Sequence, residues 1–395
     1  MLDRIADLAR RGLTARGIGL PLAAVALLVA GLVFGYSDLA VLGTAGLIAA
    51  IGSVVWVASR PPLRVQRRVE PARVARGQEC LGVVQIRNGS RWRSAALVGE
   101  DHCAGRDFEA DQPLQPIRLS PREEITTTYQ VPTRRRGIVD VGPLRIARRD
   151  PLGLVRLAWP YGKAARVWVH PRVYPLLHVP VGTNRSLDGI VDKVQHGSIT
   201  FHALREYVAG DDLRHVHWRT SAHIGQLMVR EHVDTSLPRI AVVLDDRPEV
   251  YDGDGFEDAV DAAASVVTAV VGSGLTVDLH LASGALIEGG PDIGVQPLLD
   301  LLAEVRPVEG TPFGSVLQRL RHRRRGDTAI LLTGSGSTDG SELNQAAALS
   351  EVYPTVVIGA FGGSDVRAAR LPGVTLIAAA DAAAFADGWN AVPAW

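Results

Sequence analysis

The chain has 395 residues, long enough for two or three domains of ordinary size. Its 42 basic and 42 acidic residues cancel, which excludes a protein that binds nucleic acid through a large overall positive charge. A hydrophobic share of 47% excludes a disordered chain, and a charged share of 21% is too high for a transporter made mainly of membrane spans.

Two apolar segments, residues 18–34 and 39–58, come near the beginning of the chain. Each approaches the roughly 20 residues that a helix needs to cross a bilayer. Arginines precede the first segment and follow the second, while the turn between them has no basic residue. Because positive residues stay in the cytoplasm, we expect residues 1–60 to form a transmembrane hairpin in the inner membrane, with the soluble domains in the cytoplasm. A buried core hairpin is the alternative, and a cleaved signal peptide is disfavoured because a second apolar segment follows at once.

A β-rich domain is predicted over residues 61–175. Short segments with alternating apolar residues are separated by turn signals. The clearest of them are residues 81–86, 125–131, 138–141 and 167–169. Asn88-Gly89 follows the first segment and predicts a hairpin turn. Several short strands at this spacing indicate a small antiparallel β-sandwich.

The cysteines and one arginine run of this domain allow further predictions. With the domain in a reducing cytoplasm, we expect Cys80 and Cys103 to be buried small hydrophobic side chains and not a disulfide. Arg134-Arg135-Arg136 is either a solvated loop or a contact for lipid headgroups or an acidic partner. Aromatic residues do not alternate with these arginines, as they do in proteins that bind single-stranded nucleic acid. We therefore expect no nucleic-acid partner.

A charged segment, residues 176–237, joins this domain to the next. Charges of both signs alternate there with large aromatic residues, and we expect a turn, a short helix capped by an aspartate, and a strand over residues 226–231. The segment either braces the two domains or forms a partner surface. The residues that we single out are Arg205, Glu206, Tyr207, Gly210, Asp211, Asp212, Arg214, His217 and Trp218. Zinc binding by its histidines is disfavoured, because no cysteine joins them and a helix does not place His215 and His217 on one side.

The motif in this segment resembles the family catalogued as domain of unknown function 58. The family's hallmark is similar to R-E-Y-x-x-G-D-D-x-R-x-I-H-W-x-x-S-A, followed by L-x-V-R-E. This chain departs from it at Val216 and His223, where the family has isoleucine and usually arginine. Asp150-Pro151-Leu152-Gly153-Leu154 is similar to the family's D-P-F-G-L turn. The resemblance implies two membrane spans, a β domain, and a C-terminal domain similar to a von Willebrand factor A domain.

Residues 238–395 have the pattern of an α/β domain. Short apolar segments alternate with alanine-rich and leucine-rich helical segments. The strands are expected at residues 240–244, 275–281, 328–332, 354–360 and 374–378, and helices at 256–271 and 296–305. This indicates a doubly wound sheet, which binds ligands beyond the carboxyl ends of its strands.

The resemblance also directs attention to one edge of this sheet. Von Willebrand factor A domains hold Mg²⁺ with D-x-S-x-S after the first strand, a threonine from a later loop, and an aspartate after a central strand. The corresponding positions of this chain are Asp245, Arg247, Glu249, Thr311 and Gly334. One carboxylate and one hydroxyl are too few for Mg²⁺. We expect no metal there, with the Arg247 guanidinium in the cation position and paired with Asp245, although Asp246 and Glu249 are an alternative set of ligands.

These observations favour a non-enzymatic, membrane-anchored interaction or adaptor protein with no cofactor and no small-molecule substrate. The resemblance implies a partnership with an AAA+ ATPase of MoxR type. An envelope-assembly or structural factor that works without an ATPase is one alternative, and an uncharacterised hydrolase is another. The sequence has no nucleophile elbow and no phosphate-binding loop, and the adjacent Asp211 and Asp212 are poorly placed for acid–base catalysis. Gly334-Ser335-Gly336-Ser337 follows a strand and is either an anion site or a turn.

Overall fold

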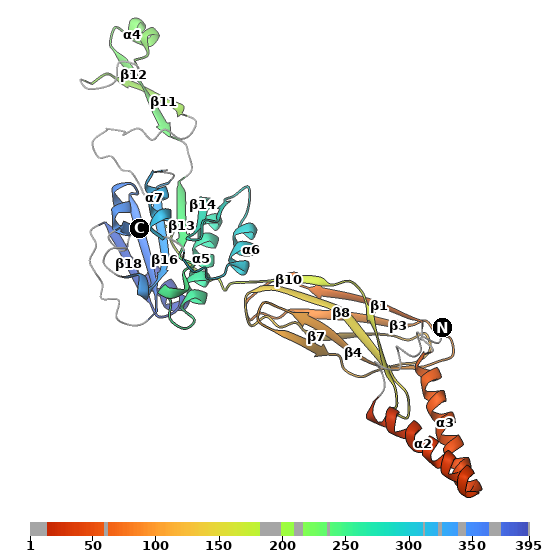
Figure 1. The fold of residues 1–395 in the computed structure, drawn as a ribbon. Helices are drawn as coiled ribbons and strands as arrows, with labels where there is room; N and C mark the ends of the chain where they lie inside the picture. The colour runs from red at the N-terminus through yellow and green to blue at the C-terminus, as the bar shows by residue number, and fades with distance from the viewer. Residues whose placement is uncertain are drawn as a thin grey trace. The chain divides into compact units, whose positions relative to one another are not determined.

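The computed structural model describes residues 14–58, 62–181, 199–208, 216–234, 238–310, 313–322, 326–338, 345–362 and 373–393. The chain divides into two compact units, Met1–Pro171 and Arg172–Trp395 (Figure 1). We call them the β unit and the α/β unit. Each has its own hydrophobic core.

Two apolar helices begin the β unit, as the sequence predicts. α2 (Ala15–Phe34) and α3 (Ser37–Ala58) are long and apolar enough to cross a membrane. Gly35 ends α2 in the left-handed conformation, with φ at 73°. A Cβ at Gly31 would lie 2.4 Å from the backbone nitrogen of Ala40, and one at Gly43 would lie 2.5 Å from that of Leu28. The two helices therefore pack closely because glycine leaves room for the facing backbone.

Two β-sheets follow the helices in the β unit. The smaller sheet is antiparallel and has the order β1 (Leu63–Glu70), β3 (Leu81–Asn88) and β7 (Glu124–Gln130). The larger has the order β2–β10–β8–β4–β5, with β6 beside β4 and β9 beside β8. Its strands are β2 (Arg73–Ala75), β4 (Ala95–Ala104), β5 (Glu109–Pro113), β6 (Ile117–Leu119), β8 (Gly137–Arg149), β9 (Arg156–Tyr161) and β10 (Ala165–His170). The strand pairs of this unit are antiparallel, as the sequence predicts, except that β2 and β10 run parallel.

The two sheets of the β unit share one core. Alternate residues of the strands point inward, as the period of two predicts, so that Ile86 of β3 and Val141 of β8 belong to the same buried cluster. Cys80 and Cys103 lie in this cluster as free thiols, which confirms the prediction that they are buried. Burial raises the pKa of Cys103 to about 12, with Asp101 nearby adding to the shift.

The predicted hairpin turn at Asn88-Gly89 is wrong. β3 pairs with β1 and β7, and the next strand along the chain, β4, belongs to the other sheet. The Asn88 side chain is fully buried and holds the connecting loop: it donates to the carbonyls of Arg93 (2.8 Å) and Ser120 (3.1 Å) and accepts from the backbone of Ser90 (3.0 Å). The asparagine therefore stabilises a crossover between sheets.

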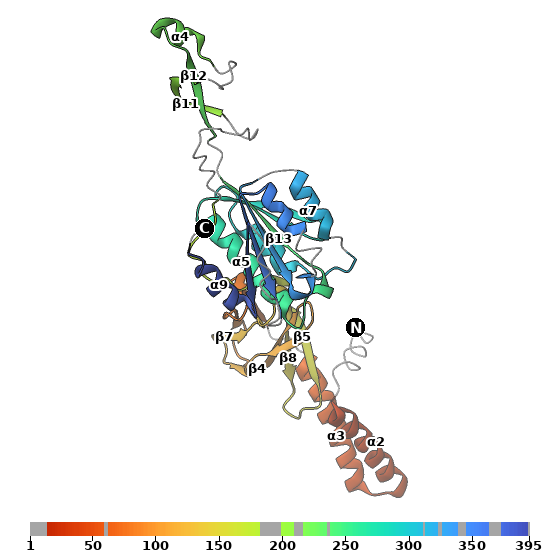
Figure 2. The same cartoon turned by 90° about the vertical axis from the view of Figure 1, so that its left-hand side faces the viewer.

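The α/β unit is built on a sheet flanked by helices, among them α5 and α7 (Figure 2). The sheet has six strands in the order β15–β14–β13–β16–β17–β18, and β15 alone is antiparallel to its neighbour. The strands are β13 (Arg239–Leu244), β14 (Thr276–Leu281), β15 (Leu286–Gly289), β16 (Thr328–Gly334), β17 (Thr355–Phe361) and β18 (Val374–Ala379). The helices are α5 (Gly255–Gly272), α6 (Gln296–Glu304), α7 (Phe313–His322) and α9 (Ala382–Asn390). One core cluster joins α5, α6 and α9 to the sheet, and another joins α7 to alternate strand residues. Helices therefore cover both faces, and the predicted α/β region is confirmed.

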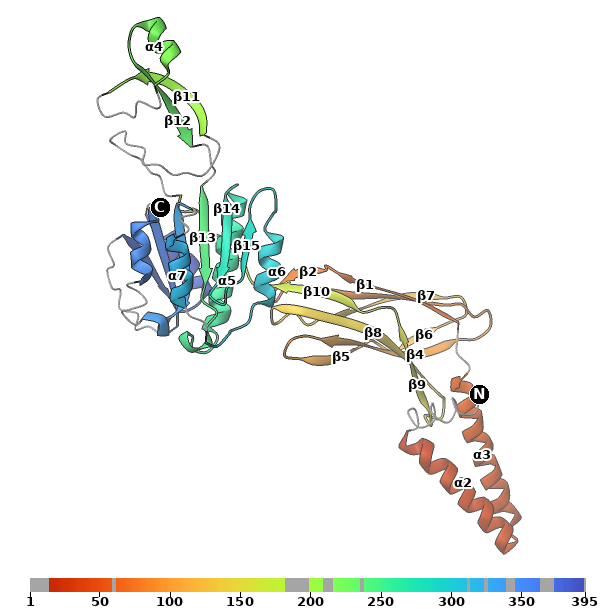
Figure 3. The ribbon, with the colours of Figure 1, turned by 45° about the horizontal axis from the view of Figure 1, so that its top comes forward.

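Residues 199–234 form a separate two-stranded sheet in their described parts (Figure 3). β11 (Ile199–Glu206) pairs with β12 (Met228–Asp234), and α4 (Trp218–Ile224) lies between them in the chain. The side chain of His217 caps α4 by accepting from the backbone of Thr220 at 3.2 Å. The predicted short helix is present as α4, but its cap is His217 and not an aspartate. The part of the prediction that concerns Asp211, Asp212 and Arg214 lies outside the described residues.

Candidate functional site

Asp245 and Thr333 lie at the carboxyl edge of the central sheet of the α/β unit. β13 and β16 are parallel neighbours, with Leu244 opposite Leu332. Each polar residue follows one of these paired leucines directly. The ends of parallel strands meet at one edge of such a sheet, and this edge is where α/β folds bind ligands.

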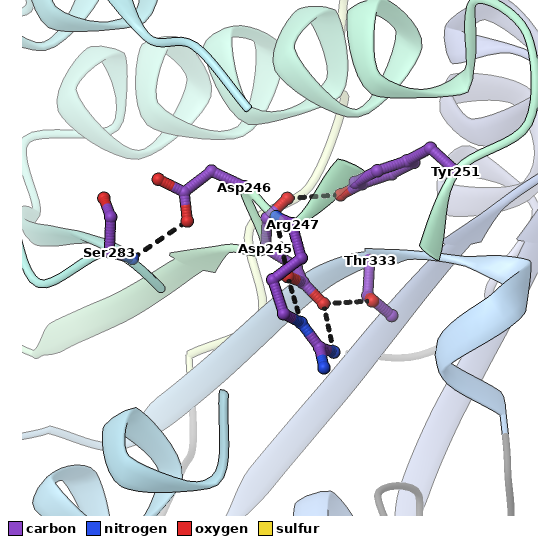
Figure 4. A network of polar contacts seen from close by, with 6 residues as sticks. All are labelled: Asp245, Asp246, Arg247, Tyr251, Ser283 and Thr333. Atoms are coloured by element: carbon purple, nitrogen blue, oxygen red, sulfur yellow. Dashed lines mark hydrogen bonds and ion pairs between the residues drawn. The ribbon is translucent and has the colours of Figure 1, made fainter. Parts of the chain in front are cut away.

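The Arg247 side chain donates two hydrogen bonds to the Asp245 carboxylate, one to each oxygen (Figure 4). Its Nε donates to Oδ1 at 2.9 Å and its Nη2 donates to Oδ2 at 2.8 Å, while the Thr333 hydroxyl donates to Oδ2 at 2.7 Å. Asp245 is fully buried, and the guanidinium lies 4.9 Å from the centre of the Phe313 ring. The predicted ion pair is present. It places a positive charge against the carboxylate in a bidentate and stacked geometry.

Asp246 points away from this pair. One of its oxygens accepts from the backbone nitrogen of Ser283 at 2.9 Å, and the other has no hydrogen-bond partner among the described residues. Burial raises the pKa of the Asp246 carboxyl, and Asp245 beside it adds to the shift. The Tyr251 hydroxyl donates to the backbone carbonyl of Asp245 at 2.6 Å. The two adjacent carboxylates thus serve different contacts and do not face a common ligand.

Gly334 is where the resemblance would place a metal-binding aspartate, and the structure leaves no space for one. A Cβ there would lie 1.9 Å from the carbonyl oxygen of Val250, because the 3-10 turn η2 (Pro248–Val250) folds over this position. Glu249 is exposed, and Thr311 lies outside the described residues. With Asp245 engaged by Arg247, the described residues do not fit a magnesium site. No group of three metal-binding side chains gathers elsewhere in the described part of the chain.

The described part of the charged segment includes β11, α4 and β12, and several of the residues singled out from the sequence lie there. Glu206 and Trp218 are exposed, Tyr207 is partly buried, and His217 caps α4. Arg205 stands in β11 opposite Val229. The predicted positions that lie outside the described residues are Gly210, Asp211, Asp212 and Arg214.

The sequence analysis singled out the charges of this region and Trp218, but it missed the exposure of Val208, Ile224 and Leu227. Val208 and Trp218 are each 63% exposed, Ile224 is 53% exposed and Leu227 is 41% exposed. These four residues flank the motif or lie within it, so the signal available in the sequence was large apolar residues in a segment otherwise rich in charge.

The sheet edge and most of the β11–α4–β12 region fall within the residues that match a known family. The chain thus has two helices of membrane-spanning length, a β unit, and an α/β unit with an ion pair at the carboxyl edge of its sheet. Residues 203–352 match the family described as "Protein of unknown function DUF58". The chain is also 25% identical over 156 residues to the uncharacterized protein YeaD of Bacillus subtilis (strain 168), a match that covers 39% of this chain and 38% of YeaD.

Solved structures are similar only over parts of the chain. One is the Pseudomonas fluorescens alkylpurine DNA glycosylase AlkC, with 9% identity, 34% of this chain and 39% of that chain covered, and a TM-score of 0.23. Another is the CARDB domain of a Pyrococcus furiosus protein, with 15% identity, 28% and 93% covered, and a TM-score of 0.20. These scores are too low to support an inference.

Proposed function

We propose that this chain is a non-enzymatic, membrane-anchored interaction protein that works with an AAA+ ATPase of MoxR type. The observation that carries the proposal is the exposed apolar surface of the β11–α4–β12 region, formed by Val208, Trp218, Ile224 and Leu227. A two-stranded sheet with one short helix buries little apolar area by itself. Large exposed apolar side chains in one region are typical of protein interaction sites, and tryptophan often dominates their binding energy.

The anchor in this proposal is the hairpin of α2 and α3 in the cytoplasmic membrane. Apolar side chains on these helices face outward; Leu32 and Val33 are each 70% exposed. The arginines at both ends of the hairpin favour a cytoplasmic position for the β unit and the α/β unit.

The closed sheet edge supports binding over catalysis. In this proposal the α/β unit is a von Willebrand factor A-like domain without its metal, and the β unit is a β-sandwich-like domain whose two sheets share one core. The Arg247 guanidinium takes the place of a metal ion beside Asp245. Acidic residues outnumber basic ones from Asp245 to the end of the chain, which favours a partner with a basic surface.

Copurification of the full chain from detergent-solubilised membranes, with and without ATP, tests this proposal. We expect an AAA+ ATPase, identified by mass spectrometry, to copurify with the wild type and to be lost from Trp218→Ala/Ile224→Ala. The matched control is Ile293→Ala, which removes an apolar side chain that is 55% exposed elsewhere in the α/β unit. Unchanged thermal unfolding of both variants shows that the loss is one of binding. If no AAA+ protein copurifies with the wild type in either condition, the proposed partnership is wrong.

A further inference from the structure

The loop of residues 89–94 in the β unit carries an unusual surface. Trp92 stands between Arg91 and Arg93 and is 89% exposed, the highest value among the large apolar side chains of the described residues. Free solvent is an unfavourable surrounding for an indole ring of this exposure. The loop therefore presents an aromatic side chain and two cations together to something outside the unit.

This loop lies beside the chain that leaves α3. The backbone nitrogen of Gly89 donates to the carbonyl of Pro62 at 2.8 Å, and Asn88 is the register partner of Leu63. Pro62 is four positions after Ala58, the last residue of α3, a span of at most about 14 Å. A third cation joins the loop, because the backbone of exposed Arg122 donates to the carbonyl of Ser90 at 3.1 Å. The tryptophan and the arginines thus stand near the end of an apolar helix.

A second set of contacts, near the turn between β8 and β9, joins the helices to the sheets of the β unit. Thr14, the N-cap of α2, donates from its hydroxyl to the carbonyl of Gly153 at 2.8 Å and from its backbone to that of Leu154 at 3.0 Å. Arg148 donates to the carbonyl of Trp56 in α3 at 3.1 Å, and its guanidinium lies 5.1 Å from the centre of the Trp56 ring. Both helices therefore contact the sheet part of the β unit, and the segment similar to D-P-F-G-L is the turn that bonds to the start of α2.

We propose that the loop of residues 89–94 lies in the headgroup region of the bilayer that α3 crosses, with Trp92 in the interface and Arg91, Arg93 and Arg122 on the headgroups of anionic lipids. The proposal rests on the proposed membrane anchor. Tryptophan is the residue typical of membrane interfaces, because its ring is apolar and its N–H is polar. Arginines next to a membrane span attract anionic lipids in the same leaflet.

The other arginine run of the β unit is a natural control. Residues 134–136 follow β7, whose last residue pairs with Leu81 at the end of β3 away from Asn88. The eight residues of β3 separate the two ends by about 25 Å. Arg136 is only 4% exposed and Arg135 pairs with Asp107 at 3.2 Å. The suggestion that this run contacts lipid headgroups is therefore less favoured than contact through residues 89–94.

A nitroxide on an introduced cysteine measures the position of the loop. Ser94→Cys places the label in the loop, and Gln78→Cys places it on an exposed residue at the opposite end of the β unit. The native cysteines are buried and do not compete for the label. The full chain is placed in nanodiscs of phosphatidylcholine alone or mixed with phosphatidylglycerol. At residue 94 we expect the mixed nanodiscs to lower collisions with a water-soluble nickel chelate and to raise collisions with oxygen, whereas residue 78 stays open to the chelate in both.

Charge-removal variants test the role of the arginines. In the mixed nanodiscs, the label at residue 94 reports how much of the loop lies in the headgroup region and how much lies in water. Arg91→Ser and Arg93→Ser should each lower this ratio by about fivefold. Arg134→Ser/Arg135→Ser should leave it unchanged. A chain that elutes apart from the nanodiscs overturns both the anchor and this proposal. A chain that co-elutes with them but leaves residue 94 open to the chelate overturns this proposal alone, as does docking that is equal in the two lipids.

Discussion

The β unit and the α/β unit both bury an arginine–aspartate pair, and the two pairs differ in what they connect. In the β unit, Arg67 of β1 donates to both oxygens of Asp101 in β4, at 3.1 and 3.0 Å, and Tyr129 of β7 donates to the same carboxylate. The two side chains that form the ion pair are 4% and 0% exposed. This pair therefore ties the smaller sheet to the larger one.

In the α/β unit the paired residues are neighbours. Arg247 and Asp245 are two positions apart, and the pair closes the edge at which β13 ends. A hydrogen bond from the Thr333 hydroxyl of β16 to Asp245 joins the pair to a residue far away in the sequence. The Arg67–Asp101 pair thus holds two sheets together, whereas the Arg247–Asp245 pair occupies the sheet edge at which α/β folds bind ligands. The difference comes from topology, because a local pair adds little to the assembly of distant strands.

Asp101→Ala should have the largest effect. Removal of the carboxylate leaves Arg67 buried without its charge partner, and we expect a loss of about 3–5 kcal/mol in the free energy of unfolding of the β unit. Urea unfolding of the detergent-solubilised chain measures it. The control is Asp140→Ala, which breaks the exposed pair with Arg166 (3.3 Å) and should cost less than about 1 kcal/mol. Equal losses in the two variants would show that the buried pair does not join the sheets.

Asp245→Ala should cost less, about 1.5–3 kcal/mol, the value for hydrogen bonds to a charged group. Arg247 keeps its contact with the Phe313 ring and lies at an edge of the unit, where it is 8% exposed. The same unfolding experiment measures the change. A loss larger than that of Asp101→Ala would reverse the comparison between a local and a long-range pair.

Gly334→Ala should cost about 1–3 kcal/mol, because the new Cβ meets the carbonyl of Val250 and the turn η2 must move. The matched control is Gly272→Ala at the end of α5, where nothing lies within 4 Å of the added carbon. That variant should be neutral or slightly stabilising. If the two alanine variants unfold alike, the closure of the sheet edge by Val250 is not a constraint.

Stability of the α/β unit should fall by about 2 kcal/mol between pH 7 and pH 5 through His280. Burial lowers the pKa of His280 to about 4 from 6.5, and Arg319 contributes to the shift. The unfolded chain then binds the proton more readily than the folded chain, so stability decreases as pH falls below 6.5. Thermal unfolding of wild type and His280→Gln against pH checks this, and identical slopes would contradict it.

Magnesium should have the smallest effect. With Asp245 held by Arg247, we expect titration of Mg²⁺ to leave the melting temperature of the wild type unchanged. A shift that appears in the wild type and disappears in Asp245→Asn would place a cation at this edge after all, and the ion pair would then be exchangeable.

Several elements followed from local pattern. The strands around residues 240–244 and 328–332 were predicted because continuous apolar runs are typical of buried parallel strands, and β13 and β16 are found there. β15, α7 and α9 were not predicted. β15 is a four-residue edge strand, and the register that makes it a strand comes from pairing with β14.

The sequence by itself determined the features that depend on neighbours along the chain. These are the two long apolar helices, the change of period between the units, and the Arg247–Asp245 pair, whose members are two residues apart. Only the tertiary structure decided that Val250 covers Gly334, that Arg67 meets Asp101, and that the loop of Trp92 is bonded through Gly89 to Pro62. Each of these contacts depends on which strands pair and in which register, and that is settled by burial of apolar faces across the whole unit.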